Sequence, residues 1–162
     1  MVYHDQIQEI HVNVFSQTSG ENTMRLRRPQ EEIAGCCWLA RIVDKVRPLK
    51  QGDFPLLYRL SLGSPFGIDG FFLRHFKIPF PPFREAVLQT RNDENLAQWF
   101  LSQPNVNATT IAKWNEYGPK LGTPGYPPGP LLRHVIKWVV YSKSIRWPVN
   151  SLFEMIEQDE AP

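Results

Sequence analysis

The spacing of apolar positions predicts a largely helical chain. After Pro29, apolar residues recur every three or four positions as far as Val46, which is typical of one buried helix face. Proline suits the first helical position, and Pro48 with Gly52 closes the segment. Gly35 inside this helix costs about 1 kcal/mol relative to alanine, which predicts close packing there. The apolar residues of this face are Ile33, Cys36, Cys37, Ala40, Val43 and Val46.

Prolines, glycines and polar caps divide the rest of the chain into shorter helices. Residues 53–68 and 118–130 are rich in proline and glycine, which predicts loops. Between and after them the pattern predicts helices over 69–78, 83–90, 92–102, 107–118 and 131–144 and a last one after Pro148. The expected N-caps are Asp69, Asn92, Asn107 and either Asn150 or Ser151.

The N-terminal residues follow a different pattern. Ile10, Val12 and Val14 alternate with polar residues, which predicts a short strand in an N-terminal arm over 1–28. A lone strand needs a partner, so this arm allows a strand-exchanged dimer. Residues 29–162 then form a single helical domain. The predicted fold class is all-α, an irregular bundle of about six helices with Pro/Gly-rich loops and a short N-terminal extended arm.

The composition favours a protein with one hydrophobic core and argues against nucleic-acid-coating, membrane-spanning and disulfide-rich classes. A 162-residue chain with 42% hydrophobic residues has enough apolar side chains for one core. The net charge of only +2 argues against a protein that coats nucleic acid. No apolar run approaches the roughly 18 residues that cross a bilayer, and no signal peptide is visible. The two cysteines, Cys36 and Cys37, are adjacent and give no disulfide framework, so we expect buried, inert thiols in a soluble cytoplasmic protein.

The first predicted helix carries a group of charged side chains beside its apolar face. Arg41 and Lys45 are four residues apart and share a face, and Asp44 is three residues from both Arg41 and Arg47. Such a group can hold an anion, with Asp44 orienting an arginine for a bidentate contact. The alternative is a solvated face with local ion pairs. Asp69 is a helix cap, a catalytic carboxylate or the partner of a cation on the first helix.

The sequence gives little support for a metal, a cofactor or a nucleic-acid site. The four histidines show no metal-ligand spacing with one another or with cysteine, and we predict no metal and no cofactor. From Tyr117 to Phe153 the chain has no acidic residue, and basic residues alternate there with aromatic ones, as in some single-strand nucleic-acid sites. Acidic residues follow at once and can neutralise this stretch. Its basic residues are Lys120, Arg133, Lys137, Lys143 and Arg146.

The run from Gly35 to Arg47 resembles the signature of a bacterial family known only as a domain of unknown function, DUF5069. Members carry the pattern G-x-x-x-L-x-R-x-x-D-K-x-R in a helix near the N-terminus. The arm over 1–25 and the loop over 118–130 depart from the family, while the acidic ending over 152–160 is similar to it. The resemblance implies a small soluble protein and supplies no mechanism. The matching residues are Gly35, Leu39, Arg41, Asp44, Lys45 and Arg47.

These observations support three functional hypotheses. The first is a non-catalytic binding or protein-interaction domain, because no catalytic constellation accompanies the charged helix. The second is a small enzyme or metabolite-binding protein for an anionic ligand. The third, less favoured, is a nucleic-acid binder that uses the basic stretch after Tyr117. For the first two, the candidate ligand-binding residues are Arg41, Asp44, Lys45, Arg47 and Asp69.

Overall fold

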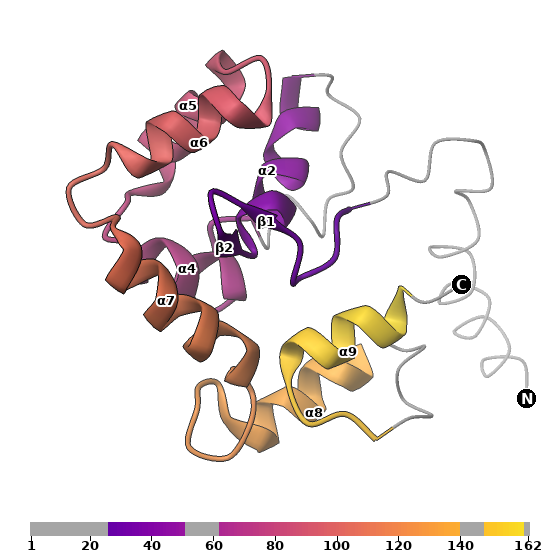
Figure 1. The fold of residues 1–162 in the computed structure, drawn as a ribbon. Coiled ribbons are helices and arrows are strands. Elements are labelled where there is room, and N and C mark those ends of the chain that lie inside the picture. The colour runs from indigo at the N-terminus through magenta and orange to yellow at the C-terminus, as the bar shows by residue number, and fades with distance from the viewer. Residues whose placement is uncertain (1–25, 51–61, 140–147, 161–162) are drawn as a thin grey trace, which may run out of the picture.

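A computed structural model describes residues 26–50, 62–139 and 148–160, and these ranges contain seven short α-helices and one β-hairpin (Figure 1). The elements are β1 (Glu32–Ile33), β2 (Cys36–Cys37), α2 (Leu39–Val46), α4 (Ile68–His75), α5 (Phe80–Gln89), α6 (Asp93–Leu101), α7 (Ala108–Tyr117), α8 (Gly129–Val139) and α9 (Leu152–Asp159). Two 3₁₀ turns, η1 (Arg47–Lys50) and η2 (Gly118–Lys120), follow α2 and α7. The predicted mostly helical, irregular fold is confirmed, with the hairpin as its one departure in the described ranges.

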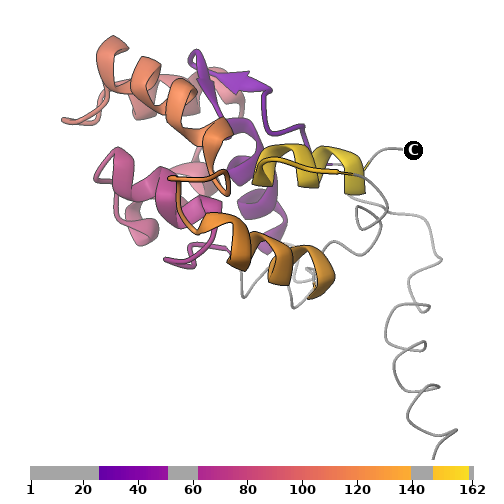
Figure 2. The same cartoon turned by 90° about the horizontal axis from the view of Figure 1, so that it is seen from below.

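The helices form an arc around α2 and the hairpin (Figure 1). Helices α5 and α6 lie at one end of this arc and α8 and α9 at the other, with α4 and α7 between them. Seen from below, α8 lies at the edge of the molecule beside α9 (Figure 2). No helix in the described ranges combines the length and the apolar character that crossing a bilayer requires. The arrangement therefore puts α2 at the centre and α8 at the periphery.

The predicted helix start at Pro29 is wrong. Residues 32–37 form an antiparallel hairpin in which Glu32 pairs with Cys37 and Ile33 with Cys36. Ala34 and Gly35 make the two-residue turn, and both have positive φ, of 56° and 69°. Two left-handed residues are what a tight hairpin turn with the right twist requires. The hairpin directs the side chains of both Ile33 and Cys36 into the core. A helix would do the same with residues three positions apart, so the apolar spacing did not distinguish the two structures.

Gly35 therefore has a different role from the predicted one. A Cβ atom built at this position would meet no other atom within 4 Å, so close packing does not explain the glycine. The positive φ of Gly35 explains why glycine occurs here, since a left-handed backbone favours a residue without Cβ. The next left-handed residue, Trp38 with φ 70°, ends the hairpin and starts α2. The backbone N–H of Trp38 donates to the carbonyl of Pro29 at 2.9 Å, which closes the loop around the hairpin.

Three predicted caps are confirmed. The side chain of Asn92 accepts from the N–H of Asn95 at the start of α6, and Asn107 forms a reciprocal capping box with Thr110 at the start of α7. Ser151 caps α9. Helix α5 begins three residues before the predicted Phe83, because its prolines occupy the first turn, where no backbone donor is required.

The predicted cap at Asp69 is wrong. Gly67 occupies the N-cap position of α4, and Asp69 is the second residue of the helix, in its first turn, with its side chain buried. The helix ends at His75 rather than Ile78, because Lys77 adopts a left-handed φ of 53°. Several predictions concern residues outside the described ranges. They are the strand at 10–14 and most of the arm over 1–28, most of the loop over 53–68, and the end of the helix predicted over 131–144.

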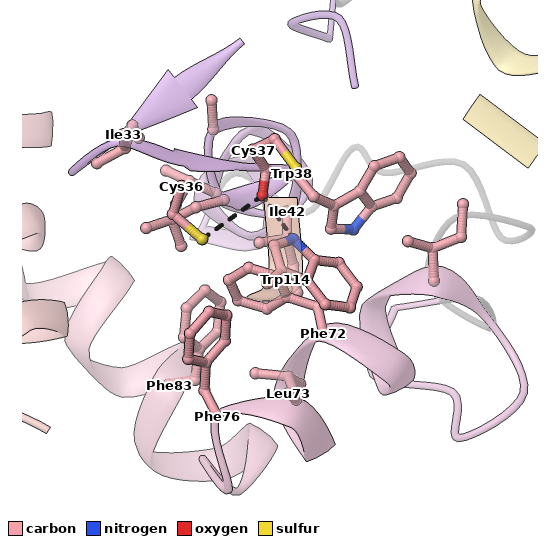
Figure 3. Packing of buried hydrophobic residues seen from close by; sticks show 14 of the residues in the cluster. Ile33, Cys36, Cys37, Trp38, Ile42, Phe72, Leu73, Phe76, Phe83 and Trp114 are labelled. Carbon is pink, nitrogen blue, oxygen red and sulfur yellow. Dashed lines mark hydrogen bonds between the residues drawn. The ribbon is translucent and has the colours of Figure 1, made fainter. Parts of the chain in front are cut away.

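Aromatic side chains fill the core between the hairpin, α2, α4 and α7 (Figure 3). The rings of Phe72 and Trp114 meet edge to face at 5.2 Å, and Phe76 packs beside Phe72 at 5.0 Å. The indole N–H of Trp114 donates to the carbonyl of Cys37 at 3.0 Å, which ties α7 to β2. Each aromatic ring buries a large area, so short helices suffice to enclose a core.

Candidate functional site

Each of the five candidate ligand-binding residues is paired with a residue of another segment. Arg41 and Lys45 are buried, and so is Asp69. Their partners come from the N-terminal entry to the domain, from α4, from the start of α6 and from the end of α9. The bonds therefore connect four segments to α2 and η1, and among these partners the sequence predicted only Asp69, as one of three alternatives.

Lys45 and Asp69 form a buried ion pair. The ammonium of Lys45 lies 3.0 and 3.1 Å from the two carboxylate oxygens of Asp69, which is 2% exposed. The indole N–H of Trp38 donates to the same carboxylate at 2.8 Å. Burial lowers the pKa of Lys45, and the negative charge of Asp69 opposes that shift. The predicted alternative of an ion pair between Asp69 and the first helix is confirmed.

Arg41 extends this charged interior towards the C-terminus. Its guanidinium donates to the carboxylate of Glu160 through two nitrogens and to the backbone carbonyl of Arg27 at 2.9 Å. Trp38 lies beneath both cations, with Lys45 4.8 Å and Arg41 5.6 Å from its ring centroid. The far end of α9 is thereby held against the start of the described chain.

Arg27, Asp44, Asp93 and Arg47 form a second group, nearer the surface. Arg27 pairs with Asp44 at 2.7 Å and also with Asp93, and Arg47 reaches Asp93 at 2.6 Å. Partial burial alone raises the pKa of Asp93, but hydrogen bonds and positive charge from the two arginines outweigh it and lower the pKa. The side chains of Arg47 and Asp93 remain 35% and 38% exposed, so solvent reaches this group.

The two groups together balance their charges. They contain four cations, Arg27, Arg41, Lys45 and Arg47, and four carboxylates, Asp44, Asp69, Asp93 and Glu160. An external anion would therefore have to compete with an internal carboxylate for any of these cations. Buried pairs of this kind are costly to break, because the remaining charge is left without a partner.

The cysteine thiols are buried and free, as predicted, but on a strand rather than a helix. Burial raises the pKa of Cys37 to about 12 and that of Cys36 further still. Since the thiolate is the nucleophile, neither thiol is activated for catalysis near neutral pH. In residues 26–50, 62–139 and 148–160, no three His, Cys, Asp or Glu side chains gather in a way that could hold a metal ion.

The predicted basic stretch is divided by the fold. Lys120 pairs with Glu116 on α7 at 2.8 Å. Arg133 is buried and donates from one nitrogen to the carbonyl of Gly122 at 2.9 Å and to that of Asn150. The side chain of Lys137 and all of Lys143 and Arg146 lie outside the described residues.

Helix α8 presents apolar side chains to solvent. Leu131 is 81% exposed, Leu132 44% and Val135 51%. Arg133 lies on the opposite side of the helix and faces inward, where it joins the loop after α7 to the residues before α9. The helix is thus attached to the domain through its arginine and displays its aliphatic side chains. Apolar periodicity alone marked these side chains as a helix face without indicating which way that face points.

A family model described as "Domain of unknown function (DUF5069)" matches residues 23–161, which include every described element. The chain belongs to the DUF5069 family. The match spans the charged interior around α2, the exposed face of α8 and the acidic helix α9. A comparison of the chain with curated proteins finds no match. The family description states no activity.

Proposed function

We propose that this DUF5069 domain is a non-catalytic protein-interaction domain that binds through the outward face of α8. The observation that carries the proposal is the orientation of that helix, with Arg133 hydrogen-bonded inside the domain and Leu131 and Val135 in solvent. Exposed aliphatic side chains that lie next to one another on one element are typical of interaction sites.

The charged interior supports the same proposal by exclusion. Lys45 and Asp69, the pair best suited to acid–base chemistry, use their hydrogen-bonding groups on each other and on Trp38. They are buried, so a substrate has no direct access to them. We infer that these residues act mainly to stabilise the fold and to join α2, α4 and α9.

A second candidate function is binding of a small anion at the exposed edge of the charged group. Arg47 favours it, because its side chain is 35% exposed and points to a region that solvent reaches. Asp93 argues against an anion site, because its carboxylate already pairs with the guanidinium of Arg47, at 2.6 Å between Oδ1 and Nη2. A thermal-shift screen with phosphate and short di- and tricarboxylates tests it. A shift that Arg47→Ala abolishes would favour the anion site over the interaction domain.

The compartment is part of the proposal. Cys36 and Cys37 are both free thiols, which supports a reducing environment such as the cytoplasm. Fractionation of cells that express the full chain tests this. Recovery of the protein outside the cytoplasm would contradict it.

Site-specific photo-crosslinking tests the interaction function. A photo-reactive amino acid in place of Leu131 should give a discrete adduct in the cells that normally produce the protein. The same reagent in place of Arg84, an exposed residue of α5 at the other end of the arc, is the matched control. Addition of Val135→Asp to the first variant should abolish the adduct, because a carboxylate would then have to enter an apolar contact. Equal labelling at both positions, or none at either, would refute the proposal.

A further inference from the structure

We infer that the guanidinium of Arg133 binds a small oxyanion, a phosphate group or a carboxylate, between α8 and the start of α9. This inference goes beyond the proposed interaction function and does not depend on it. Three observations lead to it: the part of the guanidinium that makes no hydrogen bond, the lack of a counter-ion for its charge among the described residues, and the backbone that surrounds it.

The hydrogen bonds of Arg133 leave one edge of its guanidinium without an acceptor. Nη1 makes both bonds to the carbonyls of Gly122 and Asn150. Nε is buried and meets no acceptor in the part of the chain that the structure describes, and Nη2 makes no hydrogen bond there either. The N–H groups of Nε and Nη2 are nearly parallel, so this edge is suited to two oxygens of one carboxylate or phosphate group.

The positive charge of Arg133 also lacks a counter-ion. The residue is only 9% exposed, and no carboxylate of residues 26–50, 62–139 or 148–160 forms an ion pair with it. A buried cation without a counter-ion is costly. Arg41 and Lys45 differ, because each is paired with a carboxylate that an external anion would have to displace. At Arg133 an anion would supply the missing charge and displace no carboxylate.

The chain around this arginine is poor in acidic residues. Residues 117–153 contain neither Asp nor Glu. The two glutamates that flank this stretch are engaged with other groups. Glu116 pairs with Lys120 at 2.8 Å, and Glu154 accepts from the backbone N–H of Asn150 at 2.7 Å. The nearest carboxylates along the sequence therefore already have partners, which favours an anion from solution.

The backbone beside Arg133 suits an anion. Helix α8 lies beside α9 (Figure 2), and Arg133 donates to Asn150, the residue before the N-cap Ser151 of α9. The positive end of the α9 dipole therefore lies close to the guanidinium, and it favours negative charge there. Gly122 lies against both elements, since a Cβ atom built on it would come within 3.4 Å of Cδ of Arg133 and 3.0 Å of Leu152. Any larger residue at position 122 would crowd the arginine.

Titration of the full chain with inorganic phosphate at constant ionic strength, followed by proton–nitrogen NMR, tests the inference. The Nε–H signal of Arg133 and the amide signals of residues 122–123 and 152–153 should shift and saturate. Sodium chloride is the control and should cause no saturating shift. Sodium acetate distinguishes the sources of the oxyanion: saturation by phosphate alone identifies a phosphate site, by acetate alone a carboxylate site, and by both a general oxyanion site. No saturating shift with either anion, or saturating shifts confined to Arg47, would overturn the inference.

A conservative variant tests whether the edge of the guanidinium, and not its charge alone, holds the anion. Arg133→Lys keeps the positive charge but loses the two parallel donors, so it should raise the dissociation constant of the anion that binds at least about tenfold. Arg84→Lys, at an exposed arginine of α5, is the matched control and should bind like the wild type. Unchanged binding in Arg133→Lys would overturn the inference. Circular dichroism establishes that each variant is folded, and if Arg133→Lys is not, the wild-type titration decides, because its signals report on single residues.

Discussion

Helices α2 and α8 are both short and amphipathic, yet they direct opposite kinds of side chain into the molecule. Helix α2 buries its apolar residues together with Arg41 and Lys45, and each of these cations meets a carboxylate from a distant segment. Helix α8 turns Arg133 inward and leaves Leu131 and Val135 in solvent.

The difference lies in what surrounds each helix. At the centre of the arc, α2 has neighbours on most sides, so its charges find partners and its apolar residues find a core. At the edge, α8 directs Arg133 towards the domain, where two carbonyl groups accept from the arginine. These two hydrogen bonds hold the arginine on the inner side of the helix, and the aliphatic face is then left for a partner. Four changes test this contrast.

The largest effect is expected from breaking the buried pair under α2. Asp69→Ala leaves Lys45 buried without its carboxylate and the indole N–H of Trp38 without its acceptor. We expect the free energy of unfolding to fall by about 3–5 kcal/mol, measured by urea denaturation. The double variant Lys45→Met, Asp69→Leu removes both charges and should recover most of that loss. Equal losses in the single and double variants would mean that packing, not charge, holds this site.

The next effect is expected from removing the inward arginine of α8. Arg133→Met deletes the donor to the carbonyls of Gly122 and Asn150, and hydrogen bonds from a charged group contribute about 1.5–3 kcal/mol. Unfolding free energy should fall by that amount, and amide hydrogen exchange in α8 should accelerate. Lys120→Met, at an exposed lysine of the same region, is the control and should change little. Unchanged exchange in Arg133→Met would show that α8 is held by other contacts.

A smaller effect is expected at the hairpin that sets the start of α2. Gly35→Ala places a Cβ on a backbone with φ of 69°, which should cost about 1–2 kcal/mol. Gly35→Asn should cost less, because asparagine tolerates the left-handed region better than alanine does. Thermal melting compares the two variants. If asparagine were the worse of the two, close packing rather than backbone conformation would explain the glycine.

The smallest effect is the pH dependence of the exposed charged group. The arginines lower the pKa of Asp93 below its ordinary value of 3.8, so its contribution to stability is present above that pH and is lost as pH falls further. Since the side chain is 38% exposed, solvent screening should keep this contribution below about 1 kcal/mol. Asp93→Asn should be slightly less stable than the wild type near pH 7 and converge with it in acid. A constant difference from neutral to acidic pH would contradict this assignment.

Local sequence determined much of the helical architecture. Asn92, Asn107 and Ser151 cap their helices as predicted, because a capping side chain bonds within three residues of itself. The mostly helical class followed from apolar spacing, and the burial of the cysteines from their apolar surroundings. These features depend on neighbours along the chain, which is why the sequence alone was sufficient.

Tertiary structure decided the start of α2, the partners of its charges and the direction in which α8 faces. A helix and a hairpin suited the same spacing at 33–37, and only packing against α7 distinguishes them. Asp69 lies 24 residues from Lys45 along the chain, and Glu160 lies 119 residues from Arg41. Both separations exceed the range of any local sequence pattern. Periodicity likewise identifies the apolar face of α8 but not its neighbours. Which face is buried depends on the elements that fold against it, and that information is not contained in the helix itself.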